Sequence, residues 1–146
     1  MTQRSPDSPS AIVVGVDGSD PAWRAAAYAA CLAGRQGSRL VLVYVQRLSP
    51  LASAFGPYAA DASARAALEV ERQVREGAER LASALSLNWE FYVVEGGVVD
   101  GLCSLATSLR ADAVVVGACH NRLHRVAGSP ATRLVRGGRW PVIVVP

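Results

Sequence analysis

The sequence predicts one α/β domain built on a doubly wound parallel sheet, with helices on both faces. Short runs rich in valine, isoleucine and leucine alternate with longer segments of helical periodicity. These runs are continuously apolar, as is typical of strands that are buried on both faces of a parallel sheet. The chain has 146 residues, 51% of them hydrophobic, which is enough for one domain with a core. Right-handed crossovers then give the doubly wound arrangement.

The first predicted strand covers residues 11–16 and is followed by a helix. Asp20 is expected to cap that helix, and Pro21 suits its first turn because proline needs no N–H partner there. Glycine commonly ends a helix, so we expect this one to stop at Gly34 or Gly37.

The second strand is predicted at 40–45, with a loop over 47–60 and a long helix over 61–86. Apolar residues at three- and four-residue steps predict one buried stripe on this helix: Ala66, Val70, Val74, Ala78, Leu81 and Leu85. Opposite charges four residues apart are expected to pair on its other face: Glu71 with Arg75, and Glu76 with Arg80.

The remaining elements alternate in the same way. Strands are predicted at 89–94, 113–116 and 141–145, and helices at 98–109 and from 130 to about 136. No repeat or linker divides the chain. We therefore expect a flexible polar tail over residues 1–10 and a single domain over residues 11–146.

Composition excludes several functions. All fifteen basic residues other than histidine are arginine, so a P-loop lysine, a Schiff-base lysine and a kinase-type lysine are excluded. The net charge of +3 is scattered, which does not favour nucleic acid as a partner. No apolar run is long enough for a membrane span, and no secretory signal precedes the first strand. Three widely spaced cysteines indicate neither a disulfide framework nor a zinc site, and we expect a cytoplasmic protein.

Candidate site residues follow the strands, because doubly wound sheets bind ligands beyond the carboxyl ends of their strands. Asp17 follows the first strand, where its carboxylate either accepts from a base or ribose or satisfies N–H groups of its own turn. Gly128 and Ser129 precede the last helix, where they form either an anion site or an ordinary N-cap.

The loop after the fourth strand carries a basic cluster: His120, Arg122, His124 and Arg125. These side chains either face an anion or are solvated, and no acidic residue or cysteine beside them completes a metal site. The sequence has no GxSxG elbow, and nothing in it specifies a catalytic nucleophile.

Together these segments resemble the universal stress protein family from Ile12 onward. The resemblance is carried by residues 13–19, 40–45, 111–117, 128–129, 134–136 and 141–145. It implies an adenine nucleotide alpha hydrolase-like fold, with five parallel strands in the order 3-2-1-4-5. It also implies a homodimer formed through the last strand: Val142, Ile143, Val144 and Val145.

The ATP-binding branch of that family has Gly, two residues, Gly, nine residues, then Gly and Ser or Thr after the fourth strand. The residues that match its binding positions are Asp17, Val45, Gly117, Gly128 and Ser129. His120 replaces the second glycine, only seven residues separate it from Gly128, and Pro130 removes an N–H group. We expect these departures to alter the binding of the phosphates and not the binding of the base.

The resemblance therefore implies a stress-response regulatory protein, without enzyme activity beyond slow ATP hydrolysis. Its expected ligand is ATP or AMP, with Mg²⁺, bound weakly or in an altered way. The alternative is a dimeric interaction module that binds no nucleotide. An adenylating ligase or nucleotidyltransferase is a third reading, but the turn at 17–19 and the loop at 120–124 match the motifs of neither.

Overall fold

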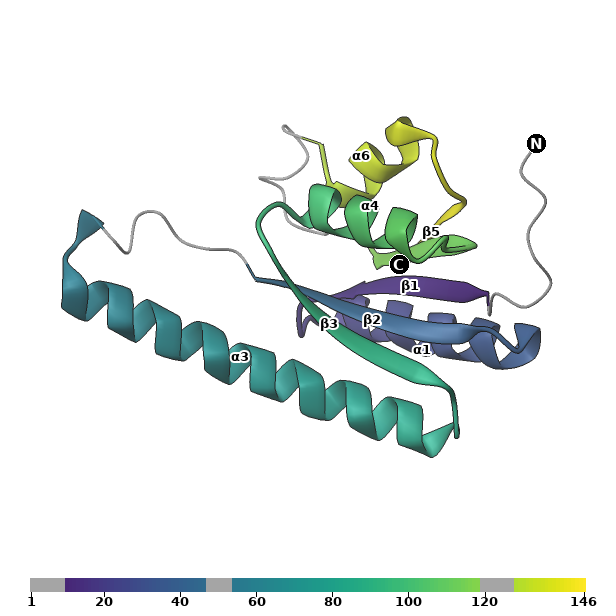
Figure 1. The fold of residues 1–146 in the computed structure, drawn as a ribbon, viewed down its shortest axis with the longest axis horizontal. Helices are drawn as coiled ribbons and strands as arrows, with labels where there is room; N and C mark the ends of the chain where they lie inside the picture. Colours follow the sequence, from purple (N-terminus) through teal and green to yellow (C-terminus); the bar gives the residue numbers. More distant parts are fainter. Residues whose placement is uncertain (1–9, 47–53, 119–127) are drawn as a thin grey trace.

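The computed structural model describes residues 10–46, 54–118 and 128–146 (Figure 1). Five strands form one parallel sheet in the order β3-β2-β1-β4-β5, which confirms the expected topology. The strands are β1 (Ala11–Val16), β2 (Arg39–Gln46), β3 (Trp89–Glu95), β4 (Ala113–Gly117) and β5 (Val142–Val145). The predicted strand boundaries differ from these by one residue or less at each end.

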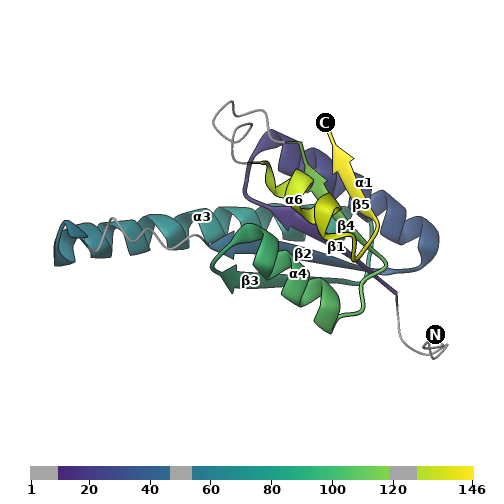
Figure 2. The same ribbon diagram turned by 90° about the horizontal axis from the view of Figure 1, so that it is seen from above.

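Four helices in the described part of the chain cover the two faces of the sheet (Figures 1 and 2). They are α1 (Asp20–Gln36), α3 (Pro57–Ala84), α4 (Val98–Ser108) and α6 (Pro130–Gly137). Helices α1 and α3 pack on one face and α4 and α6 on the other, so the sheet has a separate apolar core on each side.

The central strands β1, β2 and β4 lie between these two cores. Successive side chains of a strand point to opposite faces, so Ile12 and Val14 pack under α1 and α3 while Val13 packs under α4 and α6. All three are at most 1% exposed. Burying each such side chain stabilises the fold by about 1.5–3 kcal/mol, which explains why these runs lack polar residues.

The first turn of α1 differs from the sequence prediction. Ser19, and not Asp20, is the N-cap: its backbone is extended, with φ −76° and ψ 156°, and its Oγ accepts from the Ala22 N–H at 3.4 Å. Asp20 is the first helical residue, where its negative charge interacts favourably with the helix dipole. At the other end Gly37, one of the two glycines expected there, closes the helix with φ 64°.

Helix α3 also differs from its prediction. It begins at Pro57, ahead of the expected Asp61, and its N-terminal part extends past the end of the sheet (Figures 1 and 2). The predicted buried stripe is therefore only partly right. The buried residues are Val74, Ala78 and Ala82, whereas Val70 and Leu85 are 39% and 44% exposed.

Candidate functional site

The carboxyl ends of β1, β2 and β4 open into a cavity of about 660 Å³. This volume lies within the range of about 300–1,000 Å³ that small-molecule sites occupy. The crevice lies beyond β1, which has β2 on one side in the sheet and β4 on the other. The strand order reverses at this point, which is the usual ligand position in doubly wound sheets. The strands and the turns after them contribute one part of its lining: Gly15, Val16, Asp17, Ser19, Val43, Tyr44, Val45, Val116, Gly117 and Ala118.

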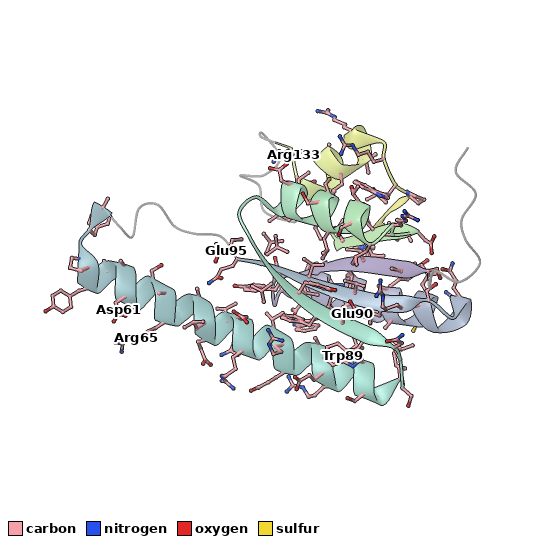
Figure 3. The ribbon with its side chains drawn as sticks, viewed as in Figure 1. Asp61, Arg65, Trp89, Glu90, Glu95 and Arg133 are labelled. Carbon is pink, nitrogen blue, oxygen red and sulfur yellow. The ribbon has the colours of Figure 1, made fainter. Side chains whose placement is uncertain are left out.

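Helices supply the apolar walls of this cavity. The overhanging part of α3 contributes Ala66, Ala67 and Val70, and α4 contributes Val98 and Leu102. Figure 3 marks the same overhanging part of α3 by Asp61 and Arg65, which form an exposed ion pair of 2.6 Å. Small-molecule sites are lined mainly by apolar side chains of this kind.

Asp17 lies at the border of the cavity and is held by its own turn. Its Oδ1 accepts from the Ser19 N–H at 3.0 Å and from the Ser19 Oγ–H at 2.6 Å. The structure thus shows one of the two roles predicted for the Asp17 carboxylate, which is to accept hydrogen bonds within its own turn. Both bonds end on the same oxygen, so the turn fixes the direction of the carboxylate beside the cavity.

Tyr44 is a cavity residue that the sequence reasoning missed. It is only 8% exposed, and it lines the cavity beside Asp17. Burial, and then the negative charges of Glu71 and Asp17, raise the pKa of Tyr44, so its hydroxyl is a proton donor at neutral pH. The signal was available in β2, because Leu40, Leu42 and Tyr44 alternate onto the face that α3 covers.

Gly117 is required by close packing. A Cβ at this position would lie 2.6 Å from the carbonyl carbon of Pro21 and 2.8 Å from the backbone nitrogen of Ala22. The end of β4 therefore touches the first turn of α1, and both border the cavity. Val45 lies at the opposite side, where its Cγ2 packs near Gly101 of α4.

Gly128 and Ser129 adjoin the cavity through Pro130, which lines it. Gly128 has φ +79°, a conformation that favours glycine. Ser129 is the N-cap of α6, since its Oγ accepts from the Thr132 N–H at 3.2 Å. Of the six predicted binding residues, Asp17, Val45 and Gly117 line one cavity. His120 and the rest of the basic cluster lie outside the described residues.

The comparisons with known proteins agree with this architecture. A family model described as the universal stress protein family matches residues 10–146. A solved structure of a member of that family from Burkholderia pseudomallei is 29% identical, with a TM-score of 0.74 over 97% of this chain and 99% of that chain. UspA from Lactobacillus plantarum is 26% identical, with a TM-score of 0.75 over 94% and 97% of the two chains.

A third solved structure is a universal stress protein in complex with cAMP. It is 25% identical, with a TM-score of 0.70 over 96% of this chain and 98% of that chain. No curated protein matches the sequence. Within the described residues, no helix combines the length and the hydropathy that crossing a bilayer requires.

Proposed function

Because the chain belongs to the universal stress protein family, we propose that it is a stress-response regulatory protein that binds an adenine nucleotide in the crevice beyond β1, β2 and β4. The observation that carries this proposal is the cavity of about 660 Å³, with Asp17, Val45 and Gly117 on its lining. The related structure in complex with cAMP supports an adenine-type ligand at a shared fold.

The base and ribose have partners in this cavity. The carboxylate of Asp17 can accept from an exocyclic amine or a ribose hydroxyl, and the Tyr44 hydroxyl can donate. The base would lie between the alanines of α3 and Val98 of α4, next to the backbone of Val45. Apolar burial on both sides of a ring, with few polar groups fixing its orientation, is the usual composition of such sites.

The phosphates and Mg²⁺ have weaker support. Asp17 is the only carboxylate among the described residues of the cavity lining, and one of its oxygens already accepts two bonds from Ser19. Mg²⁺ takes near-octahedral oxygen coordination, for which one carboxylate is a small protein contribution. We therefore assign most of the binding energy to the base and ribose. We expect ATP hydrolysis to be slow at most. Among the described residues, the hydroxyls of Ser19 and Ser129 beside the cavity both cap helices.

A thermal-shift measurement tests nucleotide binding. The melting temperature is measured alone, with about 1 mM AMP, and with about 1 mM ATP and Mg²⁺. A ligand at about 100 times its Kd stabilises by about 2.7 kcal/mol, which raises Tm by roughly 5–10 °C for a domain of this size. Asp17→Ala, which removes one acceptor for the base or ribose, should reduce the shift. Unchanged melting with every adenine compound, in protein that releases no nucleotide on acid extraction, would refute the proposal.

A second candidate function is a dimeric interaction module, and the edge strand β5 favours it. Within the described part of the chain β5 is an edge strand, bonded to β4 on one side, and its sequence from Val142 to Val145 is entirely apolar. Val144 is 42% exposed. An uncovered apolar edge strand is a template for pairing with a second copy. Light scattering behind size-exclusion chromatography should give a dimer mass, and Val144→Lys should give a monomer. A wild-type monomer at all micromolar concentrations would refute this dimer.

A further inference from the structure

We infer that the protein prefers an adenine nucleotide with a substituent on its exocyclic amine, and that this substituent lies along α3 between Asp17 and Arg80. This inference rests on the proposed function and narrows its ligand class. It follows from a second hollow of about 580 Å³ between α1 and α3, named the α1–α3 crevice below. This crevice shares Asp17 and Val70 with the cavity in which the base and ribose are proposed to bind.

One face of α3 forms a wall of both hollows. Ala66, Ala67 and Val70 line the cavity, and Val70 also lines the α1–α3 crevice. The wall of the crevice then continues at three- and four-residue steps, through Gln73, Val74, Gly77 and Arg80. Residues at these steps lie on one side of a helix, so the two walls are continuous. The helix rises about 15 Å over the ten residues from 70 to 80, which leaves room for an arm with one ring and a terminal group.

Asp17 stands where the cavity and the α1–α3 crevice meet, since it lines both. The two bonds from Ser19 end on Oδ1, so Oδ2 takes no part in the turn and can accept from a ligand. An exocyclic amine that carries one substituent keeps one N–H group. It can therefore donate to Asp17 while its substituent extends beyond the base. Such a substituent has the α1–α3 crevice beside it, and unsubstituted adenine does not reach there.

The middle of the α1–α3 crevice has an aromatic residue in a fixed position. Trp23 of α1 lines the crevice and is half-buried. Its indole packs against α3 at Gly77, where an added Cβ would lie 2.5 Å from Cη2. Val74, which is 2% exposed, lines the same crevice. An arm that carries an aromatic ring suits these residues, because a ring pair gains energy beyond the area that it buries.

Arg80 gives the far end of this wall a cation. Glu76, which was expected to pair with Arg80, instead contacts Arg72. Within residues 10–46, 54–118 and 128–146, no carboxylate forms an ion pair with Arg80. The guanidinium group has several donors in a planar fork that matches a carboxylate. The arm that fits best is therefore apolar beside Trp23 and ends in a carboxylate at Arg80.

Calorimetric titration of the full chain at about 0.15 M salt tests this inference. The ligands are AMP, AMP with a benzyl group on its exocyclic amine (benzyl-AMP), and the same derivative with a carboxylate on its ring (carboxybenzyl-AMP). We expect benzyl-AMP to bind about tenfold more tightly than AMP, because its ring buries apolar surface against Trp23. The carboxylate should add about threefold, as an exposed ion pair contributes little.

The outcomes separate this inference from the proposed function. If benzyl-AMP bound no more tightly than AMP, the inference would be overturned while the proposed function stood. If none of the three ligands bound, both would fall. Trp23→Leu should remove most of the advantage of benzyl-AMP over AMP, and AMP binding reports that this variant is folded. An undiminished advantage in Trp23→Leu would place the ring elsewhere and contradict the inference.

Arg80→Gln tests the anionic end of the arm. It should abolish the advantage of carboxybenzyl-AMP over benzyl-AMP and leave the Kd of AMP unchanged. Arg65→Gln removes the same charge from α3 outside both linings and should change none of the three Kd values. A carboxylate advantage that survived in Arg80→Gln would show that the arm does not reach Arg80.

Discussion

The indole ring of Trp23 occupies the space that Gly77 leaves open on α3. A Cβ built on Gly77 would lie 2.5 Å from Cη2 and 2.6 Å from Cζ2 of that ring. Both residues line the crevice of about 580 Å³ between α1 and α3, which reaches Asp17. The absence of one side chain therefore sets how closely α3 approaches α1, and with it the position of the α3 wall of the cavity.

Gly77→Ala should destabilise the protein. Alanine gains about 1 kcal/mol of helix propensity over glycine, but overpacking against the rigid indole costs about 1–3 kcal/mol. We expect a net loss of about 1 kcal/mol and a Tm lower by a few degrees. Denaturant unfolding monitored by tryptophan fluorescence measures this loss.

Gly34→Ala is the matched control for that substitution. Gly34 also lies in a helix, but the nearest atom to its added Cβ is Leu87 Cδ2 at 3.4 Å, an ordinary contact. This variant should be as stable as wild type or more so. If both variants gained stability equally, Trp23 would not restrain Gly77. The double variant Trp23→Leu with Gly77→Ala should recover stability relative to Gly77→Ala.

Gly117→Ala should cost more, because the new Cβ would meet backbone and not a side chain. The carbonyl oxygen of Pro21 would lie 2.7 Å away. We expect destabilisation near the upper end of about 1–3 kcal/mol, together with weaker nucleotide binding as the cavity border shifts. Chemical denaturation and calorimetry measure the two effects. Gly137→Ala, where no atom lies within 4 Å of the added Cβ, should leave both nearly unchanged.

Tyr44→Phe tests whether the hydroxyl of this cavity-lining residue donates to the ligand. The ring stays packed under α3, so stability should change little, while one donor to the ligand is lost. A neutral hydrogen bond contributes about 0.5–1.5 kcal/mol, so the affinity for an adenine nucleotide should fall about three- to tenfold in calorimetry. Tyr92→Phe removes the hydroxyl that donates to Glu90 at 2.6 Å on β3, outside the cavity lining, and should not affect binding. Equal affinity of Tyr44→Phe and wild type would remove Tyr44 from the site.

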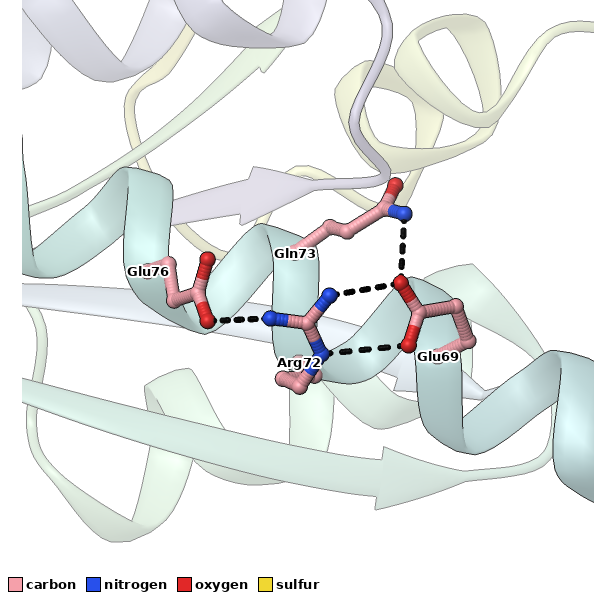
Figure 4. A network of polar contacts seen from close by, with 4 residues as sticks. All are labelled: Glu69, Arg72, Gln73 and Glu76. Atoms are coloured by element: carbon pink, nitrogen blue, oxygen red, sulfur yellow. Dashed lines mark hydrogen bonds and ion pairs between the residues drawn. The ribbon is translucent and has the colours of Figure 1, made fainter.

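A network of polar contacts on the exposed face of α3 sets the pKa of Glu69 (Figure 4). Arg72 donates to both of its carboxylate oxygens, at 2.7 and 3.1 Å, and Gln73 donates to one at 2.8 Å. These hydrogen bonds, with Arg72 first, lower the pKa of Glu69 from 4.5 to about 2. Arg72 also contacts Glu76, which was expected to pair with Arg80, while the expected Glu71–Arg75 pair is confirmed at 3.1 Å.

Arg72→Gln should return the pKa of Glu69 toward 4.5. Because the folded pKa lies below the unfolded one, ionised Glu69 supports α3 above pH 4.5, and this support is lost as the pH falls toward 2. Side-chain carboxyl NMR titration measures the pKa directly. Arg80→Gln, farther along the same helix, should leave it near 2. A wild-type Glu69 that titrates near 4.5 would contradict the network.

The sequence by itself determined the sheet. The apolar runs of β1, β2 and β4 could be read because a strand buried on both faces needs apolar side chains on both, which is a local property of composition. The same runs also predict where these strands end. Because parallel strands end at the same edge of the sheet, they place Asp17, Val45 and Gly117 near one another.

Only the tertiary structure decided the rest. Periodicity predicts which face of α3 is apolar, but what covers that face depends on where the sheet stops, so Val70 borders a cavity while Val74 is buried. Ser19 and Asp20 are both good caps, and the backbone angles at the turn chose Ser19. Asp17 and Glu71 are far apart in sequence, and both raise the pKa of Tyr44 because the fold brings them near it. Local pattern fixes the elements, whereas charges and surfaces that meet across elements exist only once the chain has folded.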